Sequence, residues 1–299
     1  MRNPCTADAT HNRRGSPVRH QRGFTLVELI MVIVIMGVIG GMVSVFMKSP
    51  IDAYIDSGRR AALTDVADTV VRRMARDIQK SLPNSIRTST SATSTNCLQF
   101  IPTKTGGRYR ATGIGALDFT AGSASFNMLG QNSTPPIPAD QLIAKDDVIV
   151  VYNLGFAPAD VYTGTNWETV SAAPVESGTP PETTITLSST KVFPLESGSM
   201  RFHVVPGAER MVSYECIGTS LRRTTSNAFA ATASCPLTGT VTTNIIANNV
   251  NCAATSTWFN YTGSDLQRNA LVSMGLTLRD ASLTESITLQ HEVHVSNTP

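Results

Sequence analysis

The chain has 299 residues, of which 15% are charged and 6% aromatic, and its formal net charge at pH 7 is +2. This composition is too apolar for a disordered chain and too weakly charged for a typical cytosolic helical protein. Five of the 24 basic and one of the 22 acidic residues lie within residues 1–23, which leaves 19 and 21 in the rest, a net charge of −2. Broad electrostatic capture of nucleic acid is therefore not expected of the body of the protein.

An uncharged run of 19 residues, Leu29–Met47, follows the basic N-terminus. As a helix that rises about 1.5 Å per residue, it would span roughly the 30 Å hydrocarbon core of a membrane. Because the arginines precede the run, the positive-inside rule predicts a cytoplasmic N-terminus and places the residues after Met47 on the other side of the membrane. A secretory signal peptide is the alternative, but no small-x-small cleavage site follows the run. We therefore expect a retained single-pass helix.

Two features of this segment differ from a plain membrane anchor. Glu28 stands one residue before the run, where a carboxylate is costly and indicates a functional role with a cationic partner. Solvation of Glu28 in the headgroup region is the alternative. Gly37 and Gly41 have GxxxG spacing, which indicates helix packing, local softening of the helix, or small residues that lipid tolerates.

The segment Arg22–Ile30, RGFTLVELI, resembles the prepilin cleavage and methylation motif of type IV pilins and type II secretion pseudopilins. The resemblance implies that a prepilin peptidase cleaves after Gly23 and N-methylates Phe24. The family glutamate falls on Glu28, which is thought to pair with the free amine of a neighbouring subunit. Opposite charges attract more strongly in a low-dielectric bundle than in water, which agrees with that role.

The resemblance also implies partners and a location. The partners are the prepilin peptidase, other minor pilins, the major pilin and the inner-membrane assembly platform. The protein is then expected in the bacterial inner membrane, with its head in the periplasm, and later in a pilus at the cell surface.

We expect three segments: a prepilin leader at 1–23, a transmembrane and assembly helix at 24–49, and a periplasmic pilin-like head at 50–299. A misassigned start codon is an alternative explanation of the long leader. Pro50 is expected to kink or restart the helix. Beyond it, apolar residues recur with helical spacing from Ile51 to Ile78 and predict an amphipathic helix at 51–80 that lies on a core.

After a polar loop at 88–96 the period changes to two, which predicts a β-rich region over 97–299. Gly106–Gly107 is interpreted as a turn before a strand at 108–110, and 111–145 and 155–182 as irregular excursions. The fold class is therefore α+β: a long N-terminal helix, half membrane-spanning and half amphipathic, packed on an antiparallel sheet as in type IV pilins. The other predicted strands are 97–102, 147–154, 183–187, 200–205, 211–217, 220–225, 272–278 and 287–295.

Four cysteines follow the leader: Cys97, Cys216, Cys235 and Cys252. An even number in an exported chain favours two disulfides, with three possible pairings. We favour Cys216–Cys235 together with Cys97–Cys252. A zinc site is the alternative, but the sequence lacks a C-x₂-C pair and a nearby histidine. Cys5 lies in the leader and would be lost on processing.

The histidines and carboxylates give no enzyme signature. His291 and His294 lack H-E-x-x-H spacing and are expected on opposite faces of a strand. No nucleophile elbow, Walker loop or G-x-G-x-x-G motif is present. Asp146–Asp147 could contribute to a calcium loop with Asp140 or Asn153, although solvation at the start of a strand is favoured. We expect no catalytic residue, no metal site and no cofactor.

Two pairs of arginines, Arg108/Arg110 and Arg222/Arg223, could contact DNA or an acidic partner. Alternation along an exposed strand explains them equally well.

The C-terminal region resembles the minor pilins of mannose-sensitive haemagglutinin (MSHA) pili, within the wider group of PilW- and J-type minor pilins and pseudopilins. The matching segments are MVSYECIGTSLRR, NCAATSTWFNY, NALVSMGLTLRD and LQHEVHVSN. The resemblance implies a role in starting or capping filament assembly. The alternatives are a type II secretion pseudopilin, and a tip adhesin or DNA-binding minor pilin that uses 111–145 and 155–182 as a ligand surface. The large head and its four dispersed cysteines argue against a major subunit.

Overall fold

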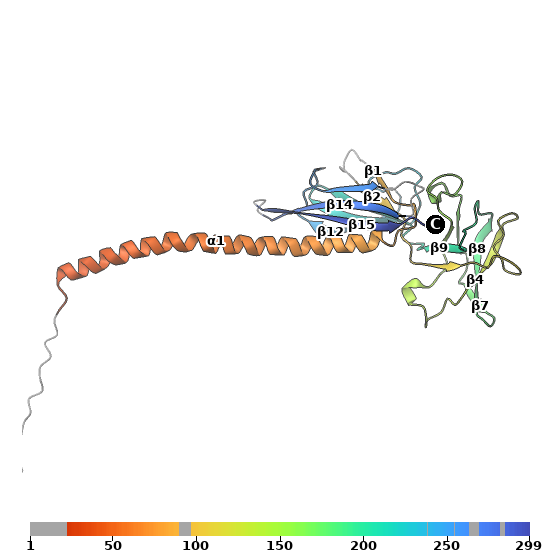
Figure 1. Ribbon diagram of the computed structural model, residues 1–299, viewed down its shortest axis with the longest axis horizontal. Coiled ribbons are helices and arrows are strands. Elements are labelled where there is room, and N and C mark those ends of the chain that lie inside the picture. Colours follow the sequence, from red (N-terminus) through yellow and green to blue (C-terminus); the bar gives the residue numbers. More distant parts are fainter. Residues whose placement is uncertain (1–22, 90–96, 238, 254, 263–268, 282–284) are drawn as a thin grey trace, which may run out of the picture. The chain divides into compact units, whose positions relative to one another are not determined.

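The computed structural model describes residues 23–89, 97–237, 239–253, 255–262, 269–281 and 285–299. The chain divides into two compact units, Met1–Asp56 and Ser57–Pro299, and the second of these is the head. The long helix α1 (Leu26–Ile78) contributes to both units. It confirms the predicted α+β arrangement of one N-terminal helix followed by antiparallel sheets (Figure 1).

Helix α1 continues through Pro50, so the expected restart of the helix does not occur. Proline removes one backbone donor and crowds the preceding turn, but it does not force a helix to end. An apolar run of membrane-spanning length lies before Pro50, where lipid would favour a helix, and the segment after it packs on the head. The helix ends at Ile78, close to the predicted limit.

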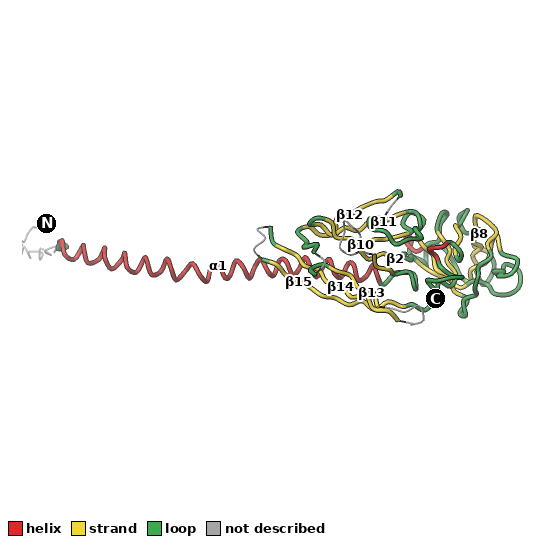
Figure 2. The backbone as a smooth tube through the Cα atoms, turned by 90° about the horizontal axis from the view of Figure 1, so that it is seen from above, coloured by secondary structure: helices red, strands yellow, loops and turns green. Residues whose placement is uncertain are grey.

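Two antiparallel sheets pack on the C-terminal turns of α1 (Figure 2). One has the order β1-β2-β10-β11-β12 and the other β13-β14-β15. The strands of the first are β1 (Arg87–Ser89), β2 (Cys97–Phe100), β10 (Met211–Ile217), β11 (Ser220–Ser226) and β12 (Val241–Asn248). Those of the second are β13 (Trp258–Thr262), β14 (Asn269–Arg279) and β15 (Ser286–Ser296).

The largest core lies between α1 and these two sheets. The helix contributes Val70, Met74 and Ile78, each at most 5% exposed. The predicted amphipathic face packs on this core from Leu63 to Ile78. Val66 does not follow the predicted stripe, because it is 49% exposed.

Two smaller antiparallel sheets form a second core. They have the orders β3-β9-β5-β6 and β4-β8-β7, and the rings of Phe126 and Phe202 meet edge-to-face at 5.4 Å between centroids. Their strands are β3 (Thr105–Arg108), β9 (Arg201–Val205), β5 (Val148–Val151), β6 (Trp167–Thr169), β4 (Ser123–Leu129), β8 (Glu182–Lys191) and β7 (Val175–Ser177). A third cluster, which includes Leu82, Ile101 and Val148, adds a further buried group of the head.

Several strand predictions need correction. The segment 111–145 is not wholly irregular, because β4 lies within it, and 155–182 contains β6 and β7. These strands are short and their apolar residues are isolated in polar sequence. Strands β12 and β13 were not predicted. Most of β12 is exposed on both faces, so it shows no alternation of apolar and polar residues.

Gly106 and Gly107 lie in strand β3, not in a turn. A Cβ at Gly106 would lie 2.8 Å from the carbonyl oxygen of Phe202, and one at Gly107 would lie 2.6 Å from Sδ of Met128. Close approach of the neighbouring strands therefore explains both glycines.

Candidate assembly site

The candidate site begins just before helix α1, at the predicted cleavage point. Gly23 and Phe24 are exposed, the latter by 81%. The backbone N–H of Leu29 donates to the carbonyl oxygen of Thr25 at 3.2 Å, and the N–H of Glu28 donates to the Thr25 hydroxyl oxygen at 3.3 Å. Thr25 therefore caps the helix.

The cap places Glu28 in the first turn of α1. The spacing Thr25-x-x-Glu28 is that of a capping box, a signal present in the sequence that the prediction did not use. A carboxylate in this turn is favoured by the partial positive charge of the helix N-terminus. The Glu28 side chain is exposed, and within the described residues it makes no side-chain hydrogen bond or ion pair.

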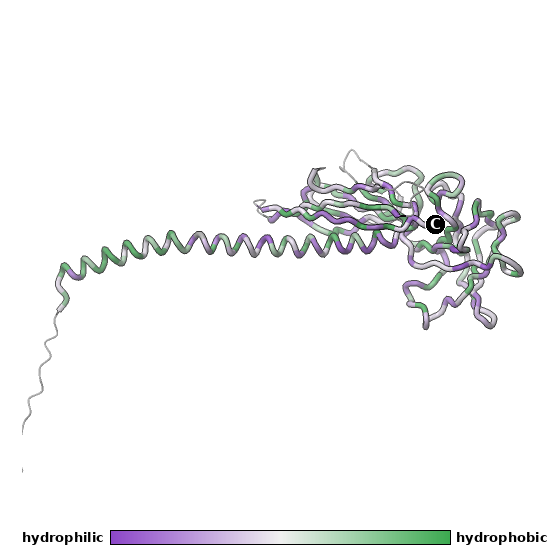
Figure 3. Tube along the Cα trace, viewed as in Figure 1, coloured by the Kyte–Doolittle hydropathy of each residue, from purple (hydrophilic) through white to green (hydrophobic). Residues whose placement is uncertain are grey.

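From Leu29 to Met47, α1 has no charged residue and most of its residues are apolar (Figure 3). Every large apolar side chain from Phe24 to Met47 is at least 47% exposed. The helix is long and apolar enough to cross a membrane. Gly37, Gly40 and Gly41 have open space where a Cβ would lie, so a neighbouring helix could approach closely there.

In the head, charged side chains of α1 form ion pairs. Arg60 donates two hydrogen bonds to Glu285, at 2.6 and 2.9 Å, and Arg72 pairs with Asp68 one turn away at 2.6 Å. The hydrogen bonds from Arg60 hold the pKa of the Glu285 carboxyl below its usual value.

All four head cysteines form disulfides, but the favoured pairing is wrong. The bonds are Cys97–Cys235 and Cys216–Cys252. In the β2–β10 register Cys97 lies opposite Glu215, so Cys97 and Cys216 face opposite sides of the sheet. Cys216 points toward the helix core, where it meets Cys252. Because the thiols are oxidised in pairs, they are not available for the zinc alternative.

The calcium alternative is also not supported. Asp147 is buried, and its carboxylate lies 2.5 Å from Nζ of Lys104. It also accepts hydrogen bonds from the backbone N–H groups of Ala144 and Gly207. Across the part of the chain that the structure describes, no three His, Cys, Asp or Glu residues are arranged to hold a metal ion.

His291 and His294 lie on opposite faces of strand β15, as predicted, and His294 is the more exposed of the two. His291 pairs with Met274 and His294 with Leu271 in the β14–β15 register. Among the described residues, neither belongs to a group of three or more His, Cys, Asp or Glu residues that could hold a metal ion.

Two of the four predicted basic candidates are neutralised within the chain. Arg110 pairs with Glu182, whose pKa it lowers through hydrogen bonds. Arg223 binds both Asp77 and Glu209. Burial lowers the pKa of Arg223, but the hydrogen bonds that it donates to these carboxylates raise the pKa more, so the guanidinium is held charged. Arg222 faces the buried Glu215 across β10 and β11.

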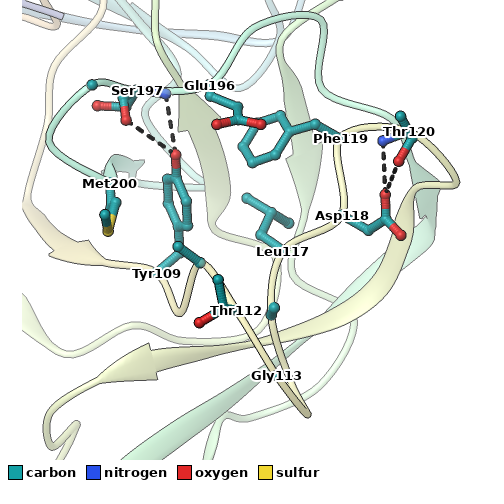
Figure 4. A pocket seen from close by; sticks show the side chains of 13 residues that line it. Tyr109, Thr112, Gly113, Leu117, Asp118, Phe119, Thr120, Glu196, Ser197 and Met200 are labelled. Atoms are coloured by element: carbon teal, nitrogen blue, oxygen red, sulfur yellow. Dashed lines mark hydrogen bonds between the residues drawn. The ribbon is translucent and has the colours of Figure 1, made fainter.

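One cavity of the head lies beside the loop that follows β3, with a volume of about 640 Å³ (Figure 4). The Tyr109 hydroxyl at its wall accepts from the Ser197 N–H at 3.1 Å, and the rings of Tyr109 and Phe119 lie 5.6 Å apart. The carboxylates of Asp118 and Glu196 line it, and Thr120 hydrogen bonds lower the pKa of Asp118. Sequence reasoning gave no signal for this cavity beyond the loop character of 111–120.

Residues 18–44 match the family model described as the prokaryotic N-terminal methylation motif. No curated protein and no solved structure matches the chain. The motif supports a type IV pilin or pseudopilin, a class whose role is structural and not enzymatic. It implies processing by a prepilin peptidase and assembly with other pilins, and together with the apolar helix it indicates a membrane-anchored single-pass protein.

Proposed function

We propose that this protein is a minor pilin of an MSHA-type type IV pilus that takes part in starting filament assembly. The prepilin peptidase cleaves between Gly23 and Phe24 and methylates Phe24, and the mature protein moves from the inner membrane into the filament. Its segments are then a leader at 1–23, an assembly helix at 24–49 and a periplasmic head at 50–299. The C-terminal resemblance to MshO-type minor pilins supports this choice of filament.

The observation that carries the proposal is the exposed start of α1. Glu28 has no side-chain partner within the described residues, and the apolar surface after it is likewise without cover. Cleavage before Phe24 creates a new cationic amine. At about 4 Å and an effective dielectric constant of about 20, two opposite charges attract by about 4 kcal/mol. Pairing of Glu28 with the amine of a neighbouring subunit would therefore set the register in which apolar helices pack.

The head supports a minor role over that of a major subunit. Segments 111–145 and 155–182 contribute strands to a second core in addition to the one around α1. A head enlarged in this way would hinder the dense packing of a filament made of this protein alone. Incorporation in a few copies, together with other minor pilins, the major pilin and the assembly platform, is compatible with it.

The test is a deletion strain complemented with wild type, Glu28→Ala or Asp52→Ala, with sheared surface filaments measured by immunoblot. Asp52 is an exposed carboxylate of the same helix and serves as the matched control. We expect deletion to abolish filaments, Asp52→Ala to restore them and Glu28→Ala to fail. Mass spectrometry of the wild type should find an N-terminal methylated Phe24. Normal filament yield in the deletion strain would contradict the proposal.

A type II secretion pseudopilin of the J type shares the leader and the fold class. In that case deletion would block secretion of exoproteins and leave surface pili intact, so the same strain distinguishes the two functions.

A ligand-binding tip protein is the second candidate, and the cavity beside 111–120 favours it. Ile114, in the same loop, is 97% exposed. The carboxylate of Glu196 at the cavity wall is exposed and free of hydrogen bonds in the described residues. For this function, Glu196→Gln should reduce attachment of cells while filament yield stays normal.

A further inference from the structure

A second cavity of the head lies over strands β3 and β9, and basic side chains line one face of it. In the register of the β3–β9 pair, Arg108 lies directly opposite Arg201, and Gly106 lies opposite His203. Residues directly opposite in an antiparallel pair share a face, with Cβ atoms about 5 Å apart. Since alternate residues of a strand also share a face, Arg108, Arg201 and His203 all lie on the same side.

The two arginines have no counter-charge in the described chain. Both are exposed, and neither lies within ion-pair distance of a described carboxylate. Like charges placed directly opposite each other destabilise a strand pair. Arg110, two residues from Arg108, is neutralised by Glu182. The absence of a carboxylate partner is therefore specific to Arg108 and Arg201 and is not shared by the neighbouring arginine.

Gly106 leaves room between these side chains. A Cβ at this position would lie 3.9 Å from Nδ1 of His203, so the imidazole lies beside a stretch of bare backbone. The resulting cavity has a volume of about 390 Å³. Its polar and basic lining residues are Thr103, Thr105, Arg108, Arg201 and His203.

We propose that this cavity binds a tetrahedral dianion, a phosphate or sulfate group. Two guanidinium groups on one face can each donate paired hydrogen bonds to such an oxyanion. The His203 ring can donate a further hydrogen bond, and a dianion neutralises both arginines at once. The proposal does not depend on the role of the protein in filament assembly.

His203 supplies a spectroscopic readout. Burial first, and then the charge of Arg201, lower its pKa below the usual value. The charged side chains near it are Arg201 on β9, Arg108 on β3 and Lys104, which is neutralised by Asp147. Strand β5 faces it with Val150. A bound dianion would cancel the repulsion from the arginines and raise the pKa of His203.

The test is a titration of the full chain in a neutral detergent with sodium phosphate at constant ionic strength. Histidine-labelled protein is followed by NMR, and His203→Gln identifies the resonance. We expect a saturable shift and an upward change in the pKa of His203. Sulfate should act as phosphate does, and acetate, a monoanion, should bind more weakly. Glycerol phosphate bound as tightly as inorganic phosphate would indicate a phosphate carried by a larger molecule, and weaker binding would indicate the free ion.

Arg201→Gln and Arg108→Gln should each weaken phosphate binding by about tenfold. Arg73→Gln is the matched control, because Arg73 is an exposed arginine on α1 that lines a different basic cavity. It should leave the dissociation constant within about twofold of wild type. The proposal is wrong if no saturable shift occurs, if acetate competes equally, or if Arg73→Gln weakens binding as much as Arg201→Gln. Far-UV circular dichroism confirms that each variant is folded.

Discussion

The two parts of helix α1, Leu26–Asp56 and Ser57–Ile78, have apolar side chains in opposite surroundings. Met42 in the first part is 63% exposed, whereas Met74 in the second is 1% exposed. The second part has charged residues on one face and two sheets of the same chain on the other. The first part has no charged residue from Leu29 to Met47, and the large apolar side chains of that run are exposed in the described chain. The comparison shows that the apolar side chains of one continuous helix can be buried in two ways. Those of the second part are buried by the head, and those of the first part require a membrane or a bundle of helices.

The largest expected effect is a difference in head stability between substitutions in the two parts of the helix. Met74→Ala should destabilise the head by about 2–5 kcal/mol, because it leaves a cavity between α1 and the sheets. Met42→Ala, the matched control, should not change the free energy of unfolding of the head. Both tryptophans, Trp167 and Trp258, lie in the head, so their fluorescence during denaturation of the full chain in detergent reports head unfolding alone. Equal loss of stability in both variants would remove the distinction.

Removal of one disulfide should have the next largest effect, again confined to the head that packs on the second part of α1. Cys216 and Cys252 are 36 residues apart, and replacement of both by alanine should cost about 2–4 kcal/mol of head stability. Amide exchange in the membrane part of α1 should stay as in wild type. Peptide mapping of the unreduced variant should recover Cys97 joined to Cys235, and any other product would contradict the pairing.

A smaller effect is expected at the start of the first part. Thr25→Ala removes the side-chain acceptor of the Glu28 N–H and should destabilise the first turn by about 1 kcal/mol. Exchange of the Glu28 amide should accelerate, and the denaturation curve of the head should not move. Thr25→Ser keeps the acceptor and should exchange as wild type does.

The smallest effect concerns a carboxyl in the head. Glu215 is 2% exposed, and burial raises its pKa above the usual value. A raised pKa in the folded state means that its stabilising contribution is present below the unfolded pKa and is lost as pH rises through the folded pKa. The stability of wild type relative to Glu215→Gln should therefore fall as the pH is raised from about 4.5, the unfolded value. A difference that rises with pH would show that Glu215 is stabilised as the anion.

The sequence predicted the features that depend on local pattern. The apolar run, the methylation motif, the strands at 211–217 and 287–295 and the α+β class all follow from residue order alone. The pairing of Cys97 with Cys235 did not, because it depends on which face of a sheet each cysteine occupies. The register that fixes those faces is a property of strands far apart in the chain.

The same limit explains the wrong prediction of a turn at Gly106–Gly107. Gly106–Gly107 resembles a turn until the strand opposite is known, since Phe202 and Met128 supply the close contacts that only glycine allows. At Pro50 a kink or a restart of the helix was expected, and the restart does not occur for a different reason. The missing N–H donor of a proline can be seen in the sequence. Whether the helix continues depends on whether the segments before and after the proline are both held as helix.

The strand that completes the head core comes last in the chain. Val293 and Val295 of β15 lie in the same cluster as Val70 and Met74 of α1, more than two hundred residues earlier. On a growing chain the apolar segment of α1 is made first, and the amphipathic turns after it lack the cover of β15 until more than two hundred further residues have been made. Contacts between such distant residues form slowly. The apolar face of α1 in the head is therefore completed by a strand that is made long after the helix itself.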